Sequence, residues 1–122
     1  MDTKTILIID DDPGYMQLVR QWLKENYKVA MVTSGSQAFR WFEKNTADLI
    51  LLDYEMPVEN GPRVFMNLRQ KENIADIPVM FLTGNNDEAI LEELQNLQHQ
   101  GILLKTMSKD ELVDKLSEFF SC

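Results

Sequence analysis

The chain has 122 residues, with 12 Lys and Arg against 20 Asp and Glu, so its formal net charge is −8. Its length and its 44% hydrophobic content predict a single domain over residues 1–122, which can bury a core without disulfides or structural metals. The acidic balance and the scattered cations argue against direct nucleic-acid binding. The apolar runs are too short to cross a bilayer, and Cys122 has no partner for an internal disulfide, so we expect a cytoplasmic domain with no membrane contact.

Apolar runs alternate with helical patterns from the start of the chain. Residues 5–9 are a β-branched and leucine run of the kind that forms a strand buried on both faces. Asp12 and Pro13 then indicate an N-cap and a first helical residue, and we expect this helix to end near Asn26.

The alternation continues through the rest of the chain. Further strands are expected over 28–33, 48–52, 77–82 and 102–104. Further helices are expected after a cap at Ser34 or Ser36, after a turn at 57–61, over about 87–98, and after a capping box of Ser108 and Glu111. Strands alternating with helices predict an α/β fold with a (βα)5, doubly wound, five-stranded parallel sheet.

Polar residues stand at the carboxyl ends of four expected strands. In an open α/β sheet, ligands bind beyond these ends, so we expect the side chains to converge at one edge of the sheet. The residues are Asp10, Asp11 and Asp12 after the first strand, Asp53 after the third, Thr83 after the fourth and Lys105 after the fifth.

The chemistry of this set favours a divalent cation. Clustered carboxylates repel one another unless a cation is present, and Mg²⁺ takes carboxylates, waters and a phosphate oxygen. No glycine-rich phosphate loop follows the first strand, so a phosphoryl group must arrive with the metal. The Lys105 ammonium and the Thr83 hydroxyl suit the other phosphoryl oxygens, and a carboxylate at a strand end can accept the phosphoryl group.

Four motifs in order across essentially the whole chain resemble the response-regulator receiver domains of two-component signalling. They are 6–12 (ILIIDDD), 48–57 (DLILLDYEMP) with Gly61, 77–83 (IPVMFLT), and Lys105. The resemblance implies a flavodoxin-like receiver fold. It also implies a signalling module rather than an enzyme, with at most self-phosphorylation from small phosphodonors and autodephosphorylation.

The resemblance implies a role for each matching residue. Asp53 is the implied phosphoacceptor, and Thr83 and Lys105 contact the phosphoryl group. The implied Mg²⁺ ligands are Asp10, Asp11, Asp53 and the backbone carbonyl of Glu55, whereas Asp12 is left to cap the helix. Glu55 and Asn85 match variable positions that influence dephosphorylation. The implied partners are a histidine kinase or phosphotransfer protein upstream, and an effector protein or a missing output domain downstream.

Two positions depart from the family pattern. Thr106 stands where proline usually follows the lysine, and Ile102 stands where the family often has an aromatic residue. These departures motivate a second hypothesis, a receiver-like interaction module that acts without phosphorylation.

A third hypothesis is a phosphatase of the haloacid-dehalogenase type. There Asp10 would be the nucleophile and Asp12 the general acid, but Pro13 and Gly14 do not fit the expected spacing and the chain leaves no room for a cap domain. Outside these motifs, His99 is expected to be an exposed loop residue.

Overall fold

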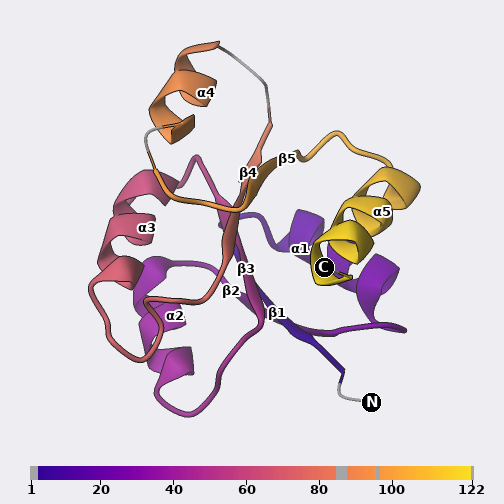
Figure 1. The fold of residues 1–122 in the computed structure, drawn as a ribbon, viewed down its shortest axis with the longest axis horizontal. Coiled ribbons are helices and arrows are strands. Elements are labelled where there is room, and N and C mark those ends of the chain that lie inside the picture. Colours follow the sequence, from indigo (N-terminus) through magenta and orange to yellow (C-terminus); the bar gives the residue numbers. More distant parts are fainter. Residues whose placement is uncertain (1–2, 85–87, 96, 122) are drawn as a thin grey trace.

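The computed structural model describes residues 3–84, 88–95 and 97–121. Its elements are β1 (Thr5–Ile9), α1 (Pro13–Leu23), β2 (Lys28–Val32), α2 (Gly35–Phe42), β3 (Leu49–Asp53), α3 (Gly61–Arg69), β4 (Val79–Thr83), α4 (Glu88–Gln95), β5 (Gly101–Leu104) and α5 (Lys109–Phe120). The strands form one five-stranded sheet in the order β2-β1-β3-β4-β5, and every pairing is parallel (Figure 1). This confirms the predicted doubly wound sheet.

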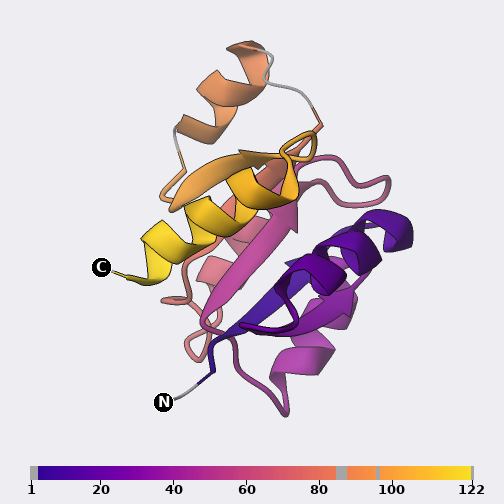
Figure 2. The ribbon, with the colours of Figure 1, turned by 90° about the vertical axis from the view of Figure 1, so that its right-hand side faces the viewer.

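The sheet separates two apolar cores. Alternate residues of one strand enter different cores: Leu7 and Ile9 pack toward α2 and α3, whereas Ile6 and Ile8 pack toward α1 and α5. Figure 2 shows α1 and α5 side by side over one face of the sheet. Because both faces are covered, the inner strands must be apolar at every position, which accounts for their unbroken hydrophobic runs.

Helix α1 begins as predicted and ends earlier. The Asp12 side chain caps it by accepting a hydrogen bond from the Tyr15 N–H (3.2 Å). The helix stops at Leu23, three residues before the expected end. The Leu23 carbonyl accepts the N–H groups of both Asn26 (3.0 Å) and Tyr27 (2.9 Å), which closes a turn into β2.

The other helix caps follow the sequence closely. Ser34, rather than Ser36, caps α2 by accepting a hydrogen bond from the Gln37 N–H (3.2 Å). The capping box of α5 is confirmed, with Ser108 and Glu111 each accepting a hydrogen bond from the other's backbone N–H. Within the described ranges, no helix is long and apolar enough to cross a membrane.

Helix α4 is shorter than the expected 87–98. It ends at Gln95, where the Leu94 carbonyl accepts a turn hydrogen bond from the Leu97 N–H (3.0 Å), and Asp87 lies outside the described residues. Leu94 is the one α4 residue in the described part that is fully buried. Ile90 is half-buried and also packs against the core, so helix α4 is attached through few side chains.

Candidate functional site

Four polar residues meet where the strands end. Asp10 directly follows β1, Asp53 is the last residue of β3, Thr83 is the last residue of β4 and Lys105 directly follows β5. Since β1, β3, β4 and β5 are consecutive neighbours in the sheet, their carboxyl ends lie along one edge. The convergence expected from the sequence is thus present in the fold.

Three carboxylates form a candidate cation site. Asp10, Asp11 and Asp53 each offer one carboxylate oxygen, and these atoms all lie within 4.8 Å of one another. Asp10 and Asp53 are buried, whereas Asp11 is exposed. Oδ1 of Asp10 accepts the Asp12 N–H (2.9 Å), and its buried Oδ2 is paired with the Lys105 ammonium. Three converging carboxylates carry more negative charge than one lysine neutralises, and hard oxygen ligands of this kind suit a divalent cation such as Mg²⁺.

The ammonium of Lys105 lies between two of these carboxylates. Its Nζ is 2.8 Å from Oδ2 of Asp10 and 3.3 Å from Oδ1 of Asp53. The Lys105 backbone N–H donates to the Thr83 carbonyl (2.9 Å), which fixes the start of the loop after β5. Burial lowers the pKa of Lys105, but the two carboxylates outweigh burial and raise it, so this lysine stays charged.

Asp53 has an environment that resists ionisation. Burial raises its pKa most, the charge of Asp10 raises it further, and Lys105 offsets part of this, leaving the pKa at about 7. Oδ1 of Asp53 also accepts a long hydrogen bond from the Glu55 N–H (3.3 Å). Without a further cation, this carboxylate is therefore partly protonated near neutral pH.

The strand end that carries Asp53 is held by close contact with α3. The N–H of Gly61, the first residue of α3, donates to the Tyr54 carbonyl (2.9 Å). A Cβ at Gly61 would clash with the Asp53 carbonyl oxygen and would lie 2.9 Å from the Tyr54 Cα. Glycine is required here because helix and strand backbones touch.

Tyr15 is a residue of this site that the sequence did not reveal to us. Its ring centroid lies 5.0 Å from Nζ of Lys105, and burial, followed by the charges of Asp10 and Asp53, raises its pKa to about 12. The signal available in the sequence was its place in the first turn of α1, directly after the acidic strand end. Helical spacing alone does not single it out, because the apolar face of α1 begins with Met16.

His99 is not the exposed loop residue that we expected. It is half-buried, its Nδ1 accepts the Gly101 N–H (3.0 Å), and its ring meets the Phe81 ring edge-on at 5.5 Å. The imidazole thus fixes the turn into β5 and covers β4.

The remaining residues with predicted roles lie near the carboxyl ends of the strands, except one that the structure does not describe. Thr83 is the buried last residue of β4, and Glu55 is exposed and comes two residues after the end of β3. Both therefore lie at the expected edge of the sheet, and their contacts with a ligand remain predictions. Asn85 lies outside the described residues. Asp12 caps α1 through its side chain, which is the role that we predict for it, and the phosphatase hypothesis is not favoured.

Comparison with known proteins gives a consistent family. The sequence model of the response regulator receiver domain family matches residues 6–117 of this chain. The chain is 31% identical over 120 residues to the sensor histidine kinase TmoS of Ectopseudomonas mendocina, covering 98% of this chain and 12% of that protein. It is 33% identical over 117 residues to the nitrate/nitrite response regulator protein NarL of Escherichia coli, covering 93% of this chain and 53% of NarL.

A solved structure agrees with these relatives. The receiver domain of the sensor histidine kinase PA1611 from Pseudomonas aeruginosa, solved with a magnesium ion coordinated in its active-site cleft, matches with a TM-score of 0.86 at 27% identity. The match covers 99% of this chain and 100% of that one. The chain spans only part of the length of TmoS and NarL, about half of NarL and much less of TmoS. Sequence, fold and site together show that the chain belongs to the response regulator receiver domain family of two-component signalling.

Proposed function

We propose that this receiver domain accepts a phosphoryl group on Asp53 from a histidine kinase or a phosphotransfer protein. The observation that carries the proposal is the position of the buried Asp53 carboxylate, which shares one cluster with Asp10 and Asp11 and faces the Lys105 ammonium at 3.3 Å. The relatives include a sensor histidine kinase and a response regulator, which supports an upstream partner of this kind.

Asp10, Asp11 and Asp53 would hold Mg²⁺, together with the backbone carbonyl of Glu55. The fit rests on the three converging carboxylate oxygens, whose combined charge the single ammonium of Lys105 only partly offsets. When bound, Mg²⁺ would neutralise carboxylate charge and coordinate a phosphoryl oxygen.

The chain's own residues would carry the transfer. A carboxylate oxygen of Asp53 forms a bond to phosphorus while the phosphorus–nitrogen bond of the donor phosphohistidine breaks, and the imidazole leaves with the electron pair. The Lys105 ammonium lies close enough to Asp53 to balance charge on the transferred group, and the Thr83 hydroxyl would bind another phosphoryl oxygen. Beyond its signalling role, such a domain would show at most self-phosphorylation from small donors and autodephosphorylation.

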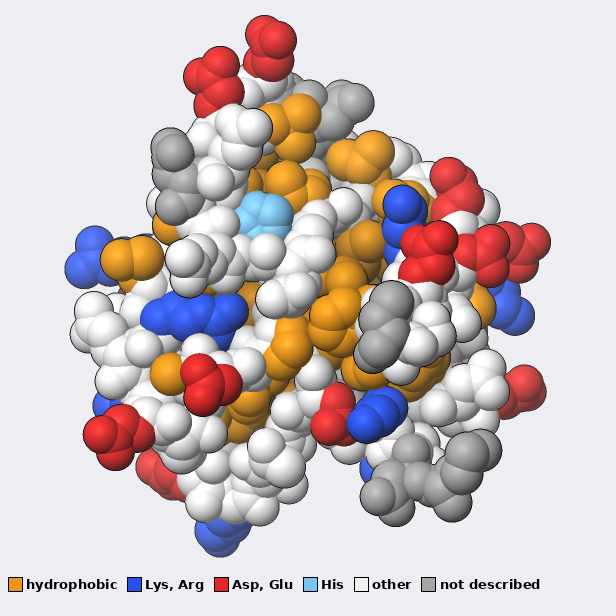
Figure 3. Space-filling view, in the orientation of Figure 1, with side chains coloured by type: hydrophobic (Ala, Val, Ile, Leu, Met, Phe, Trp, Pro, Cys, Tyr) orange, Lys and Arg blue, Asp and Glu red, His pale blue; other side chains and the backbone are white. Residues whose placement is uncertain are grey.

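A surface around α4 and β5 would report the phosphorylation state. Thr83 ends β4 and leads toward α4, which packs on the core through Leu94 and Ile90. A groove beside α4 and β5 is lined by residues that include Leu91, His99 and Ile102. Figure 3 shows apolar side chains along the middle of this face, between α4 and α5.

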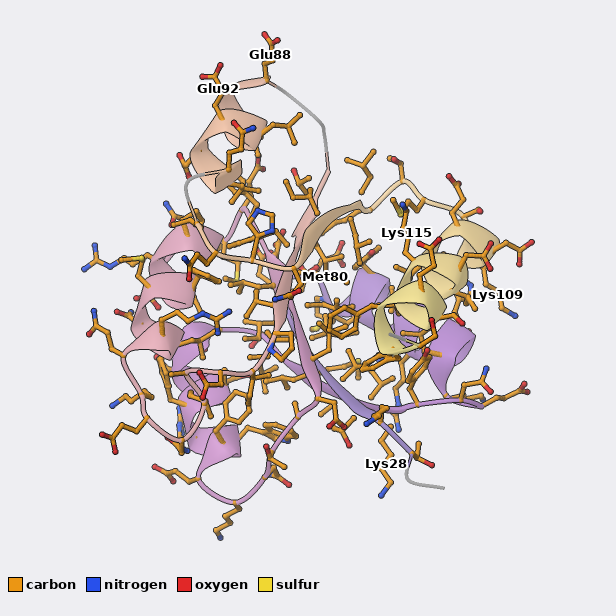
Figure 4. All side chains as sticks on the ribbon, viewed as in Figure 1. Lys28, Met80, Glu88, Glu92, Lys109 and Lys115 are labelled. Atoms are coloured by element: carbon orange, nitrogen blue, oxygen red, sulfur yellow. The ribbon has the colours of Figure 1, made fainter. Side chains whose placement is uncertain are left out.

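The rim of this surface is acidic on the α4 side. In Figure 4, Glu88 and Glu92 point from α4 into solvent, away from the sheet, whereas Lys109 and Lys115 lie on α5. An effector protein, or an output domain in the same protein, with basic side chains would complement α4.

The proposal is tested by incubating the protein with acetyl phosphate and Mg²⁺. We expect one hydroxylamine-labile phosphoryl group per chain, measured by intact mass. Asp53→Ala is expected to take up none, whereas Asp114→Asn, which changes an exposed acid on α5, is expected to react like the wild type. Uptake by Asp53→Ala, or none by the wild type in the presence of Mg²⁺, would overturn the assignment.

A further inference from the structure

An aromatic side chain stands beside the Lys105 ammonium. Tyr15 lies in the first turn of α1, and its ring centroid is 5.0 Å from Nζ. Both side chains are half-buried, with the Lys105 side chain 20% exposed. An ammonium over an aromatic face at this distance is held by the ring quadrupole, and the attraction grows as water is removed.

The long side chain of Lys105 is held at its ammonium end by two ion pairs, and Tyr15 adds an uncharged contact there. The Lys105 backbone N–H is fixed by the Thr83 carbonyl, but the ammonium sits at the end of four methylene groups, and the next residue is Thr106 rather than a conformationally fixed proline. The contacts that the structure describes for Nζ are the carboxylates of Asp10 and Asp53 and the ring of Tyr15. Tyr15 is the member of this set that attracts the ammonium without carrying a charge.

We propose that Tyr15 is a positioning residue whose aromatic face holds the Lys105 ammonium at the Asp10–Asp53 pair. The consequence for phosphoryl transfer rests on the proposed function, because Lys105 acts there on the group transferred to Asp53. The placement of the ammonium itself does not depend on phosphorylation and is tested separately.

The state of the phenol supports this role. Burial, and then the charges of Asp10 and Asp53, raise the Tyr15 pKa to about 12, so the ring stays neutral at physiological pH. A neutral ring presents its face to the cation without adding a fourth negative charge to the acidic cluster.

The alternative is that Tyr15 only fills space in the core below α1 and α5, against which it packs. Tyr27 offers a matched control, because it is also a half-buried tyrosine packed against that core. Its ring contact is with Phe120, at 5.4 Å between centroids. Replacing either tyrosine by leucine removes a ring from the same core, but only the Tyr15 change removes a ring from Lys105.

The first experiment measures the rate at which an acylating reagent labels Nζ of Lys105 in the unphosphorylated protein, by peptide mass spectrometry, with the exposed Lys115 as internal reference. We expect Tyr15→Leu to speed labelling of Lys105 by about threefold to tenfold, Tyr15→Phe to restore protection, and Tyr27→Leu to leave it unchanged. If Tyr15→Leu does not fold, Tyr15→Met takes its place. An unchanged Lys105 rate in the folded variant, or equal loss of protection in Tyr15→Phe, would overturn the proposal.

The second experiment measures the rate of Asp53 phosphorylation by acetyl phosphate and Mg²⁺. We expect Tyr15→Leu to slow it by about threefold to tenfold in the wild-type background and to have no further effect in the Lys105→Met background. An equal loss in both backgrounds would mean that Tyr15 acts on core packing rather than through Lys105. If the wild type takes up no phosphoryl group, the proposed function fails, while the labelling result still decides the placement of the ammonium.

Discussion

At the scale of single residues, Asp53 has a protonation state set by its neighbours. In the unfolded chain its pKa returns to the ordinary value of 3.8, whereas in the folded chain burial and Asp10 raise it to about 7. Between these values the folded state binds more protons than the unfolded state, so stability falls as pH rises through this window. The full loss of folding stability from the Asp53 charge is therefore present above pH 7 when no cation is bound.

We therefore expect Asp53→Asn to stabilise the protein at pH 8 by roughly 1 to 3 kcal/mol and to flatten the fall in stability between pH 4 and 7. The asparagine keeps the shape of the side chain and removes the charge that Asp10 repels. Denaturant unfolding in EDTA across this pH range measures the effect. A variant that loses stability at pH 8 would show that the Lys105 contact outweighs burial and repulsion.

At the scale of elements, the meeting of β3 and α3 determines where Asp53 sits. Gly61 lets the first turn of α3 touch the backbone of Asp53 and Tyr54, and a side chain there has no room because the obstructing atoms are backbone. The helix and the strand end are therefore positioned as one unit.

We expect Gly61→Ala to destabilise the protein by about 2 kcal/mol, since helix and strand must separate to admit a methyl group. Gly84→Ala is the control, because a Cβ at Gly84 meets nothing within 4 Å. Thermal unfolding of both variants measures the difference. Equal melting temperatures would show that the α3 backbone yields without cost.

Elements also show what sequence patterns can and cannot predict. The strands are predictable because short apolar runs bounded by turn residues are typical of strands buried on both faces, and the place of the strand-end acids follows from parallel topology. The ends of α1 and α4 were predicted too late because the closing turns use backbone carbonyls, of Leu23 and Leu94, which leave no side-chain signal. The role of Tyr15 escaped prediction because its partner, Lys105, is distant in the chain, and the burial of His99 comes from its packing on the equally distant Phe81.

At the scale of the whole molecule, part of the −8 charge is concentrated at one edge of the sheet. A ligand that binds only the folded state stabilises the whole fold, and the candidate cation site forms only when β1 and β3 pair. Asp11 is the exposed member of the cluster, so it can be changed without leaving a buried charge unpaired.

We expect Mg²⁺ to raise the free energy of unfolding by about 2 to 3 kcal/mol at a concentration one hundred times its dissociation constant. Asp11→Asn is expected to remove most of this gain while changing stability in EDTA by less than about 0.5 kcal/mol. Melting temperatures at increasing Mg²⁺ measure both effects. A full Mg²⁺ response in Asp11→Asn would place the ion elsewhere.

The strand order has a consequence for how the protein is made. Asp10 follows β1 and Asp53 ends β3, two neighbouring strands, but Lys105 follows β5, which pairs with β4 at the edge of the sheet. During synthesis the acidic residues leave the ribosome long before the lysine that neutralises them. A nascent chain that stops short of β5 therefore lacks the ammonium that pairs with Asp10 and Asp53, so bringing these carboxylates together costs more free energy than in the finished domain. The complete site, with Lys105 in place, would therefore form only once almost the whole domain has been translated.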